Sequence, residues 1–390
     1  MDEHDRPAMG DVVVYNHARA YHGFTLIAPL GARRASLVNM DGVPVHSWDL
    51  PYPVVGDAVL LPTGRLLYCA QGEDVALPEL EGAAGSIVEV DWDGNIVWRY
   101  DDPRLHHTFS RTESGSTFVL RWVELPKHIA RAVRGGRPVR SSEAPASWSD
   151  AITEVGGDGL PIWEWRAYEH LDPESDSICP HCPRTQWPGL TACSILPDGK
   201  IATSLQRTHN VAIIERSTGS IRWRWGLGEI AHASAVTALT DGHLLILDNG
   251  MHTYDDPMGF SRVLEVDPST DEIPWIYEDV PRSNFYTSVL GNAQRLPNQN
   301  TLICDATEGR VFEVTPSGET VWEFYNSSSE KTALYGRTNY IFRAYRYGPG
   351  FAGLPGNASD AASEGNDVTQ SVGDLSENEV LQKRLESLGY

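Results

Sequence analysis

Residues 291–324 read GNAQRLPNQNTLICDATEGRVFEVTPSGETVWEF, and this phrase decides the fold. Two apolar strands flank a polar turn, two more strands flank a second turn, and the phrase closes on Trp322 and Phe324. The first half of the phrase is the pattern of a β-hairpin. Five copies of it, this one included, occur at residues 58–70, 108–122, 192–205, 235–250 and 293–306.

The second half, which ends in tryptophan, occurs six times. The six endings place tryptophans at positions 48, 98, 163, 223, 275 and 322, so that neighbouring copies lie 47 to 65 residues apart. Four strands per unit of roughly 50 residues is the period of a β-propeller. Six second halves against five first halves predict an all-β, six-bladed propeller over residues 11–350. Strands from both termini, near 25–50 and 338–347, should close its last blade. A β-solenoid or two β-sandwiches is the alternative.

Two insertions interrupt the repeat. Residues 123–147 fall inside the second blade and carry Lys127, Arg131, Arg134, Arg137 and Arg140, with no acidic residue between the first and the last of them. In a chain of net charge −22 this local reversal of sign predicts a lid that attracts an anionic substrate. Arg131 and Arg134 are therefore candidate substrate-binding residues, although a solvated helical face would look the same. Residues 166–190 form the second insertion and contain cysteines.

The C-terminal region differs in composition from the repeats. Residues 351–375 are rich in Gly, Ser, Asp and Asn, which predicts a flexible linker. Ser376 and Glu379 form a capping-box pattern, so residues 376–390 are expected to form a short amphipathic helix. We expect this helix to be a possible contact between copies of the chain.

The overall composition limits the kinds of binding partner and the cellular compartment that we expect for this protein. The net charge of −22 argues against nucleic acid, and the longest apolar run falls short of the roughly 18 residues of a membrane span. The acidic first residues show no secretory pattern. The five cysteines are scattered, and Cys69 and Cys304 sit inside apolar runs. These features together favour a reducing cytoplasm.

Histidines gather in the loops of one propeller face. That face collects the loops leading into the first strand of each blade and the loops joining second and third strands. Clusters of histidine are typical of catalytic and metal sites, although each residue alone could be structural. The candidates are His106, His107, His232 and Asn292 before first strands, and Arg207, His209 and His252 between second and third strands.

The motif CPHC at residues 179–182 is a weaker signal. A structural zinc needs four ligands, and of the nearby residues His170 could add one to Cys179 and Cys182. A redox pair and ordinary loop cysteines remain open alternatives.

Several stretches resemble the arylsulfotransferase family. They are residues 291–324, THNVAIIERSTGSIRWRWG at 208–226, LLILDNG with SRVLEVD at 244–267, and FRAYRYGPGF at 342–351, and the likeness covers roughly 50–350. It implies a six-bladed propeller that moves a sulfo group from a phenyl sulfate to a phenol through a covalent histidine. It also implies an aromatic or anionic small-molecule substrate and no required cofactor, although a metal ion stays possible.

Carried over by motif, the resemblance implies roles for particular residues. HHTF supplies His106 or His107, and RTHN supplies Arg207 and His209. The family histidine before the fourth blade falls on Ser234, with His232 two residues earlier, so His232 or His209 is the expected nucleophile. The implied catalytic residues are His107, His209, His232 and Arg207; the implied substrate-binding residues are His106, His252 and Asn292.

Two other functions compete with sulfo transfer. A metal-dependent hydrolase or lyase would use ligands from His106, His107, His209, His232 and His252, because several neutral imidazoles can hold a transition metal. A non-catalytic binding propeller is the third. No Walker A or G-x-S-x-G motif occurs, so P-loop nucleotide chemistry and classical serine-hydrolase chemistry have no motif support.

Overall fold

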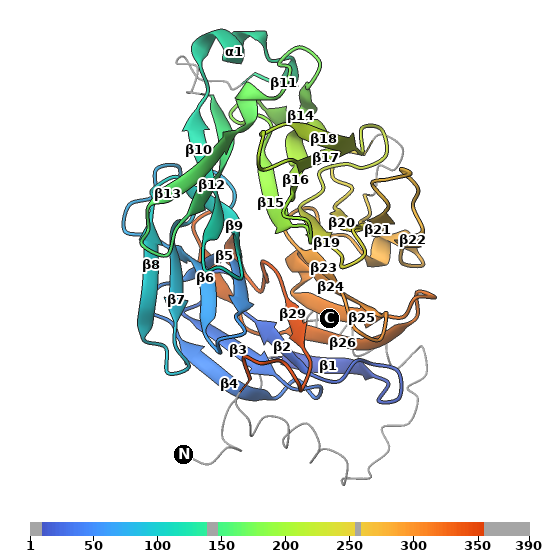
Figure 1. Cartoon of the computed structure of the whole chain (residues 1–390). Coiled ribbons are helices and arrows are strands. Elements are labelled where there is room, and N and C mark those ends of the chain that lie inside the picture. The colour runs from blue at the N-terminus through green and yellow to red at the C-terminus, as the bar shows by residue number, and fades with distance from the viewer. Residues whose placement is uncertain (1–9, 139–146, 254–258, 355–390) are drawn as a thin grey trace.

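Six antiparallel blades of four strands surround a central axis (Figure 1). The computed structural model describes residues 10–138, 147–253 and 259–354. The first strand of each blade is innermost, and the predicted six-bladed propeller is confirmed. The strands of the first three blades are β5 Val54–Leu60, β6 Leu66–Gln71, β7 Gly85–Val90 and β8 Ile96–Asp101; β9 Leu105–Arg111, β10 Thr117–Glu124, β12 Trp148–Val155 and β13 Pro161–Arg166; and β15 Leu190–Ile195, β16 Ile201–Leu205, β17 Asn210–Ile214 and β18 Ile221–Trp225.

The fourth and fifth blades are β19 Ala235–Ala238, β20 Leu244–Asp248, β21 Arg262–Val266 and β22 Trp275–Tyr277; and β23 Asn292–Arg295, β24 Thr301–Asp305, β25 Arg310–Val314 and β26 Thr320–Asn326. The sixth blade joins both ends of the described chain. Its inner strand β29, Tyr345–Tyr347, pairs with β2, Phe24–Ile27, and β3 Arg34–Val38 and β4 Pro44–Asp49 follow. The predicted closure by strands from both termini is therefore confirmed.

A second closure was not predicted. Strand β1, Gly10–Tyr15, adds to the outer edge of the fifth blade, antiparallel to β26. The chain then crosses to the sixth blade and begins β2. Since the N-terminal segment spans two blades, it joins them independently of β29.

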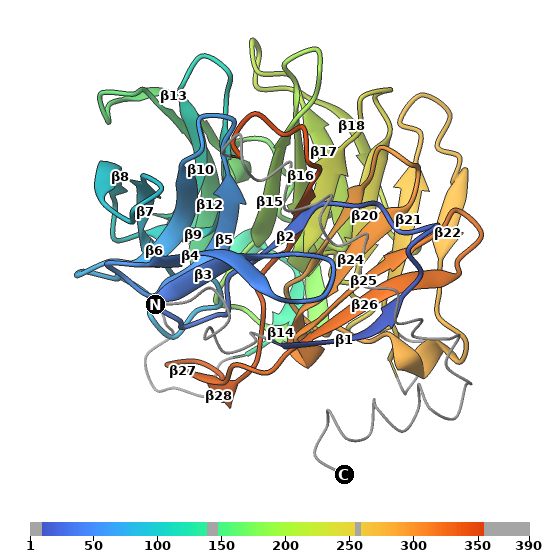
Figure 2. The ribbon, with the colours of Figure 1, turned by 90° about the horizontal axis from the view of Figure 1, so that it is seen from below.

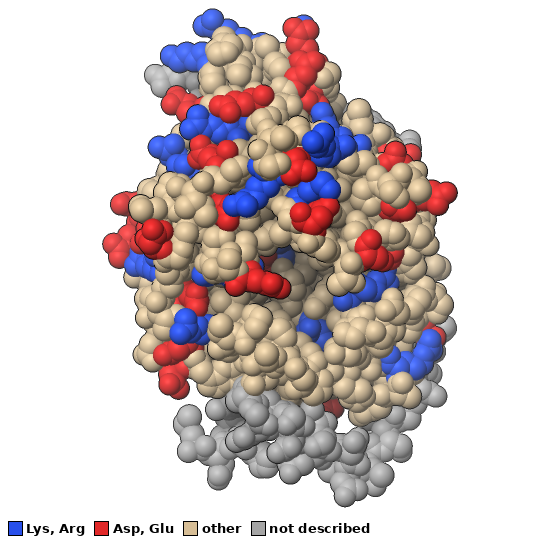
Figure 3. All heavy atoms as spheres, in the orientation of Figure 1, with Lys and Arg blue, Asp and Glu red and all other residues tan. Residues whose placement is uncertain are grey.

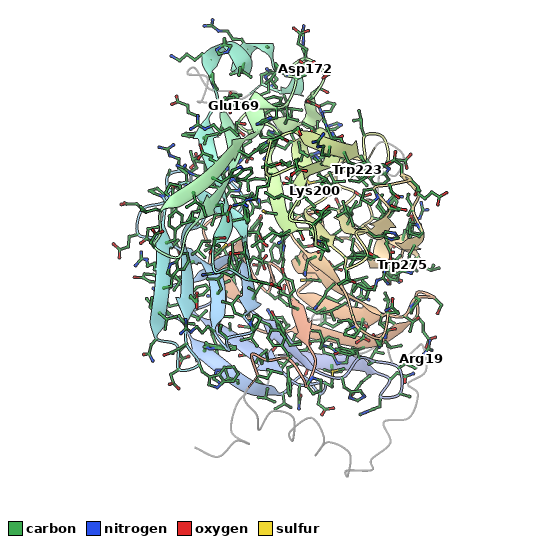
Figure 4. The ribbon with its side chains drawn as sticks, in the orientation of Figure 1. Arg19, Glu169, Asp172, Lys200, Trp223 and Trp275 are labelled. Carbon is green, nitrogen blue, oxygen red and sulfur yellow. The ribbon has the colours of Figure 1, made fainter. Side chains whose placement is uncertain are left out.

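The repeated tryptophans form a ring of bonds between blades. In every blade an indole nitrogen on the fourth strand donates to the turn between the third and fourth strands of the next blade, over distances of 2.7 to 3.1 Å. Figure 4 labels two donors, Trp223 on β18 and Trp275 on β22. In the second blade the donor is Trp165, bonded to Gly219, and not Trp163, the tryptophan of the sequence repeat. Both residues lie on one face of β13, because side chains two apart along a strand point the same way.

The apolar core lies between the blades. Six clusters of buried side chains each join two neighbouring blades, for example Phe24 and Leu37 of the sixth blade with Tyr68 and Val88 of the first. Each blade thus stabilises its neighbours, and loops at one end keep fixed positions.

The two insertions pack on each other at the rim. The first holds helix α1, Lys127–Ala132, and strand β11, Gly135–Arg137; the second holds strand β14, Ile178–Pro183, which pairs with β11 in parallel. Figure 2 shows β14 at the same end of the propeller as the hairpin β27–β28, Glu330–Thr332 and Gly336–Thr338. Arg140, most of the predicted linker and the predicted helix at 376–390 lie outside the described residues.

No helix in the described ranges is long and apolar enough to cross a membrane. The face seen in Figure 3 is hollowed at its centre, and acidic and basic side chains are interspersed around the hollow.

Candidate metal centre and channel mouth

Four of the predicted site histidines share an uncommon backbone conformation. His107, His209, His232 and His252 have φ values of 59°, 56°, 61° and 66°. This left-handed region costs an L-residue about 1–2 kcal/mol. Strain of this kind gathers at functional sites, where the surrounding structure holds a side chain in a required position.

The repeat itself shows what the loop requires at position 209. His209 ends the 3-10 turn Gln206–Thr208 between β16 and β17, and Gly309 ends the matching turn Ala306–Glu308 between β24 and β25. Their φ values are 56° and 61°. Glycine adopts this backbone conformation without strain. The presence of a strained histidine at position 209 therefore indicates that its side chain is needed there.

Two cysteines and two histidines from three separate segments meet beside this loop. Cys179 and Cys182 come from β14, His232 from the loop before β19, and His252 from the loop after β20. One ligand atom from each lies within 4.8 Å of all the others. The cysteines and His232 are buried, and His252 is half-buried. The structure therefore brings the CPHC motif, an isolated signal in the sequence, into the histidine cluster.

The distances match those of a tetrahedral metal site. The Cys179 sulfur lies 3.4 Å from His252 Nδ1 and the Cys182 sulfur 3.5 Å from His232 Nε2. The Cys182 sulfur is 3.8 Å from His252 Nδ1, and the two nitrogens are 3.2 Å apart. With zinc–sulfur bonds of about 2.3 Å and zinc–nitrogen bonds of about 2.05 Å, a tetrahedron has edges of about 3.6 Å between S and N and about 3.3 Å between two N.

The protonation of His232 and Cys179 suits a metal, whereas Cys182 would have to lose its proton on metal binding. Burial lowers the pKa of His232 to about 4, so its imidazole is neutral near pH 7. A hydrogen bond from Cys182 lowers the pKa of the Cys179 thiol, and the same bond together with burial raises that of Cys182. Thiolate and neutral imidazole are the forms that bind transition metals.

Arg207 and His209 border the cluster. The rings of His209 and His232 are 4.8 Å apart, and the buried His209 Nε2 has no hydrogen-bond partner among the described residues. Arg207 Nε donates to Gln186 over 2.9 Å, and the Arg207 guanidinium also acts on Cys182. A positive charge and an uncommitted imidazole thus lie next to the candidate ligands.

His107 belongs to a different arrangement. His107 Nδ1 is 2.8 Å from His106 Nδ1, and His106 Nε2 is 3.4 Å from the carboxylate of Asp150. Burial raises the pKa of Asp150 to about 7 and lowers that of His107 to about 3. The buried His107 Nε2 has no partner in the described part of the chain. Three of the four histidines expected to converge therefore meet at the metal centre, and His107 lies in a buried line with His106 and Asp150.

The mouth of the channel is lined by one residue from each of several blades. His107, Thr191 and Ser234 each stand eight residues before the glycine of their hairpin turn, and all three line one narrow cavity with Arg343. Arg343 donates to Asp57 over 2.7 Å and to the carbonyls of Thr191 and Ser234 over 3.0 and 3.3 Å. Its buried guanidinium therefore joins blades around the axis.

The remaining predicted residues lie apart from the cluster. The side-chain amide of Asn292 donates to the carbonyl of Ala344 and accepts from the Ala344 N–H, both at 3.0 Å. These two backbone hydrogen bonds give the side chain a structural role that needs no substrate. Arg131 and Arg134 are exposed on the first insertion, at the rim of the propeller in Figure 1. Arg134 is 3.9 Å from Glu174 of the second insertion.

Sequence reasoning missed Cys179 and Cys182 as partners of the histidines, and it missed Asp150. The spacing of CPHC was the one available signal, because no local pattern marks Asp150.

The chain is a six-bladed propeller with a candidate metal centre at one end. No protein-family model and no curated protein matches the sequence. Among solved structures, a protein of unknown function from Bacteroides caccae aligns at a TM-score of 0.52 with 13% identity, over 83% of this chain and 98% of that one. The WD40 propeller domain of Doa1 aligns at 0.45 with 10% identity, over 86% and 92%. A catalytically inactive virginiamycin B lyase from Staphylococcus aureus aligns at 0.42 with 13% identity, over 75% and 83%. At this identity the first likeness shows the fold alone, and the two weaker ones carry no argument.

Proposed function

We propose that this chain is a metal-dependent enzyme, a hydrolase or lyase, whose metal is bound by Cys179, Cys182, His232 and His252. The observation that carries the proposal is the convergence of four donor atoms from three segments to within 4.8 Å, at separations that fit a tetrahedron. The hydrolase or lyase hypothesis from the sequence drew only on histidines, and zinc at Cys179 and Cys182 was a separate alternative with His170 as a further ligand. The present ligand set retains His232 and His252 and adds the two cysteines.

The donor set favours zinc. Magnesium and calcium prefer oxygen ligands, whereas thiolate and imidazole suit zinc, copper and iron. Two sulfurs and two nitrogens in tetrahedral array are one of the usual ligand sets of zinc. We therefore expect zinc as the resident metal.

The neighbouring side chains supply the functions that hydrolysis or elimination requires. When bound, the metal would act as a Lewis acid. Arg207 would stabilise negative charge that develops on the substrate, and His209 would accept a proton through its unpartnered Nε2. His252, the half-buried member of the set, is the ligand that a substrate atom would most readily replace.

Metal analysis of the purified protein tests this proposal. We expect about one zinc per chain by plasma mass spectrometry, lost in Cys179→Ala and His232→Ala. Cys193→Ala is the matched control, because Cys193 is also a buried free cysteine but lies on β15 outside the cluster. Wild-type protein that holds no stoichiometric transition metal after purification with added zinc would refute the proposal.

Sulfo transfer through a histidine is the second candidate function. It is supported by the line Asp150–His106–His107, since the unpartnered His107 Nε2 faces a cavity that also holds Arg343. A neutral imidazole is a competent nucleophile, and cationic groups would stabilise the sulfuryl oxygens. Incubation with 4-nitrophenyl sulfate alone should then raise the intact mass by one sulfo group, and His107→Ala should abolish the rise. Absence of both metal and adduct would leave a binding propeller.

A further inference from the structure

Three buried side chains form a line that begins in the channel cavity. His107 lines this cavity, and its Nδ1 lies 2.8 Å from Nδ1 of His106. On the far side of the His106 ring, Nε2 lies 3.4 Å from Oδ1 of Asp150, and neither of these two atoms has a hydrogen-bond partner in the described part of the chain. Because catalytic hydrogen bonds are often long before a substrate binds, a gap of this width can carry a proton.

Contacts with neighbouring elements fix both rings. The His107 N–H donates to the carbonyl of Gly82, in the loop before β7, over 2.8 Å. Gly82 has a φ of 75°, and a Cβ there would come within 2.5 Å of His107 Nδ1, so only glycine lets the backbone pack this closely on the ring. The ring of His106 stacks on that of Trp122 in β10, with centroids 4.6 Å apart. The protein therefore sets the direction of the line before a ligand binds.

With both rings neutral, the protons of this line have two arrangements. Between the two Nδ1 atoms one ring donates and the other accepts, because a neutral imidazole carries one N–H. When Asp150 is ionised, it accepts from His106 Nε2–H, His106 Nδ1 accepts from His107 Nδ1–H, and His107 Nε2 keeps its lone pair. When Asp150 is protonated, both bonds reverse and His107 Nε2 carries a proton. A proton that enters at His107 Nε2 can therefore reach Asp150 by two transfers along the line.

The surroundings disfavour a charged imidazole at either position. Burial, Arg343 and Arg207 lower the pKa of His107 to about 3. Burial and the neighbouring His107 lower the pKa of His106 well below its usual value, although the carbonyl of Arg121 acts in the opposite direction. A proton that arrives at His107 is therefore passed on.

Asp150 is the group that can hold this proton. Burial raises the pKa of Asp150 to about 7, although the backbone N–H groups of Gly189 and Leu190 and the charge of Arg207 act in the opposite direction. Both states of the carboxyl group are therefore populated near neutral pH, which lets it accept a proton and release it again.

The channel cavity adds a positive charge to this proton acceptor. It is lined by Glu81, His107, Gln206, Ser234 and Arg343, among others. The Nε of Arg343 is buried and has no hydrogen-bond partner among the described residues. Gln206 precedes Arg207, and Ser234 follows His232 by two positions, so the cavity borders the metal centre. A proton acceptor and a cationic donor in one cavity fit a hydroxyl group that loses its proton.

We propose that Asp150, His106 and His107 form a proton relay through which the channel cavity deprotonates a hydroxyl group of its substrate. The O–H bond breaks, its electron pair stays on the oxygen beside Arg343, an N–H bond forms at His107 Nε2, and the transfers along the line leave one proton on Asp150. His107 is the catalytic residue, and His106 and Asp150 are positioning residues that act through it. The relay stands without the metal; as part of an enzyme it rests on the proposed function, as a base in addition to His209.

Nitrogen NMR of the full-length protein, before and after treatment with a chelator, shows which nitrogen of His107 carries its proton. The signals are assigned by comparison with His107→Gln. We expect a bare Nε2 and a protonated Nδ1 at about pH 9, the reverse at about pH 5, and one midpoint near pH 7. Infrared spectra should show a buried carboxylic acid that loses its proton at the same midpoint.

Three variants assign these signals to the line. Asp150→Asn, which keeps the shape of the side chain, should remove the infrared band and make the His107 tautomer independent of pH. His106→Gln should keep the infrared band and uncouple it from His107; if this variant does not fold, Asp150→Asn alone decides. Asp305→Asn is the matched control, because Asp305 is an equally buried carboxylate on β24, outside the line, and it should titrate like wild type.

Proton removal is tested with 4-hydroxyacetophenone, a phenol that is mostly uncharged in water at neutral pH and whose anion absorbs at longer wavelength than the protein. With wild-type protein we expect a saturable anion band together with a gain in the carboxylic acid band. Asp150→Asn should show neither, and Asp305→Asn should show both.

Several results would overturn the relay. They are a His107 that keeps a protonated Nε2 at high pH or carries protons on both nitrogens at about pH 5, a tautomer change that survives in Asp150→Asn, and a wild type that forms no anion from the probe. None of these readouts depends on bound metal. A protein without metal that shows the expected signals refutes the proposed metal-dependent enzyme and keeps the relay, whereas a zinc protein that lacks them does the reverse.

Discussion

His209→Gly should stabilise the metal-free protein while it weakens the metal centre. The φ of 56° at His209 costs an L-residue about 1–2 kcal/mol, which glycine does not pay. Removal of the buried, unpaired Nε2 relieves about 1 kcal/mol more. Against this, glycine loses about 0.5–1 kcal/mol through the greater freedom of the unfolded chain. Loss of a half-buried ring removes about 1 kcal/mol of packing.

The net expectation is a stabilisation of about 0–1.5 kcal/mol, which in a chain of this size raises Tm by at most about 2 °C. Scanning calorimetry of chelator-treated protein measures it without a contribution from bound metal. Gln299→Gly is the control, because Gln299 is exposed in a turn with φ of 71° and touches no candidate ligand. It should give a similar backbone gain and leave metal affinity unchanged, whereas His209→Gly should lower metal affinity about 10–100-fold. A fall in Tm of several degrees in metal-free His209→Gly would refute the reasoning, because it would make His209 a structural residue.

Four further expectations concern stability. Zinc at about 1,000 times its Kd should stabilise the fold by about 4 kcal/mol, and a chelator should reverse the gain; an unchanged Tm would contradict the metal site. Trp165→Phe removes the 2.9 Å bond to the next blade and should cost about 1–3 kcal/mol, clearly more than Trp163→Phe, as chemical denaturation can measure. Arg343→Met leaves the carboxylate of Asp57 buried without its 2.7 Å partner and should cost about 3–5 kcal/mol; a near-neutral result in the same assay would show that the axis does not depend on this pair. The folded-state pKa of Asp150 is raised to about 7, so the folded protein holds this proton more tightly than the unfolded chain, and its contribution to stability falls as pH rises from about 4 to about 7; Asp150→Asn should flatten that part of a Tm–pH profile.

The number of blades could be predicted from the sequence because one interaction, a hydrogen bond from an indole to the next blade, repeats in every blade. Each fourth strand presents an indole that bonds to the next blade, so a tryptophan and a turn recur at every unit. Trp163 and Trp165 show the limit of that pattern. They lie on one face of one strand, and only the position of Gly219 in the neighbouring blade decides which indole is bonded.

Strand β1 shows a second limit. It pairs with the edge of the fifth blade, some 300 residues away in sequence, through backbone bonds that any extended segment can make. Its sequence GDVVVY is compatible with a strand, but nothing in it identifies β26 as the strand with which it pairs. The contacts of the cysteines could not be predicted for the same reason. CPHC lies in an insertion, and only the folded position of β14 brings it to His232 and His252.

The sequence predicted on which face of the propeller the histidines lie, but not which of their side chains meet. The loops of His209, His232 and His252 follow from the repeat, and the propeller fixes where such loops gather. The difference between these three residues and His107 depends on side-chain direction. His107 points into the channel cavity and is backed by His106 and Asp150, a carboxylate that lies 43 positions away in the chain.

The centre is held together by more than its own ligands. Strand β14, which carries both cysteines, pairs with β11 of the first insertion, and within the second insertion the indole of Trp187 donates to the carbonyl of Asp176 over 2.6 Å. His232 is held by the fourth blade, where the carboxylate of Asp248 accepts a hydrogen bond from the neighbouring Ala231 N–H at 2.8 Å. Because these contacts do not involve the ligand atoms, the protein positions the four donors before a metal arrives, unlike a zinc finger, which folds only around its metal. Four protein ligands are the set of a closed structural zinc, so the proposed chemistry requires that one of them, His252, can be displaced, with Arg207 and the unpartnered Nε2 of His209 beside it.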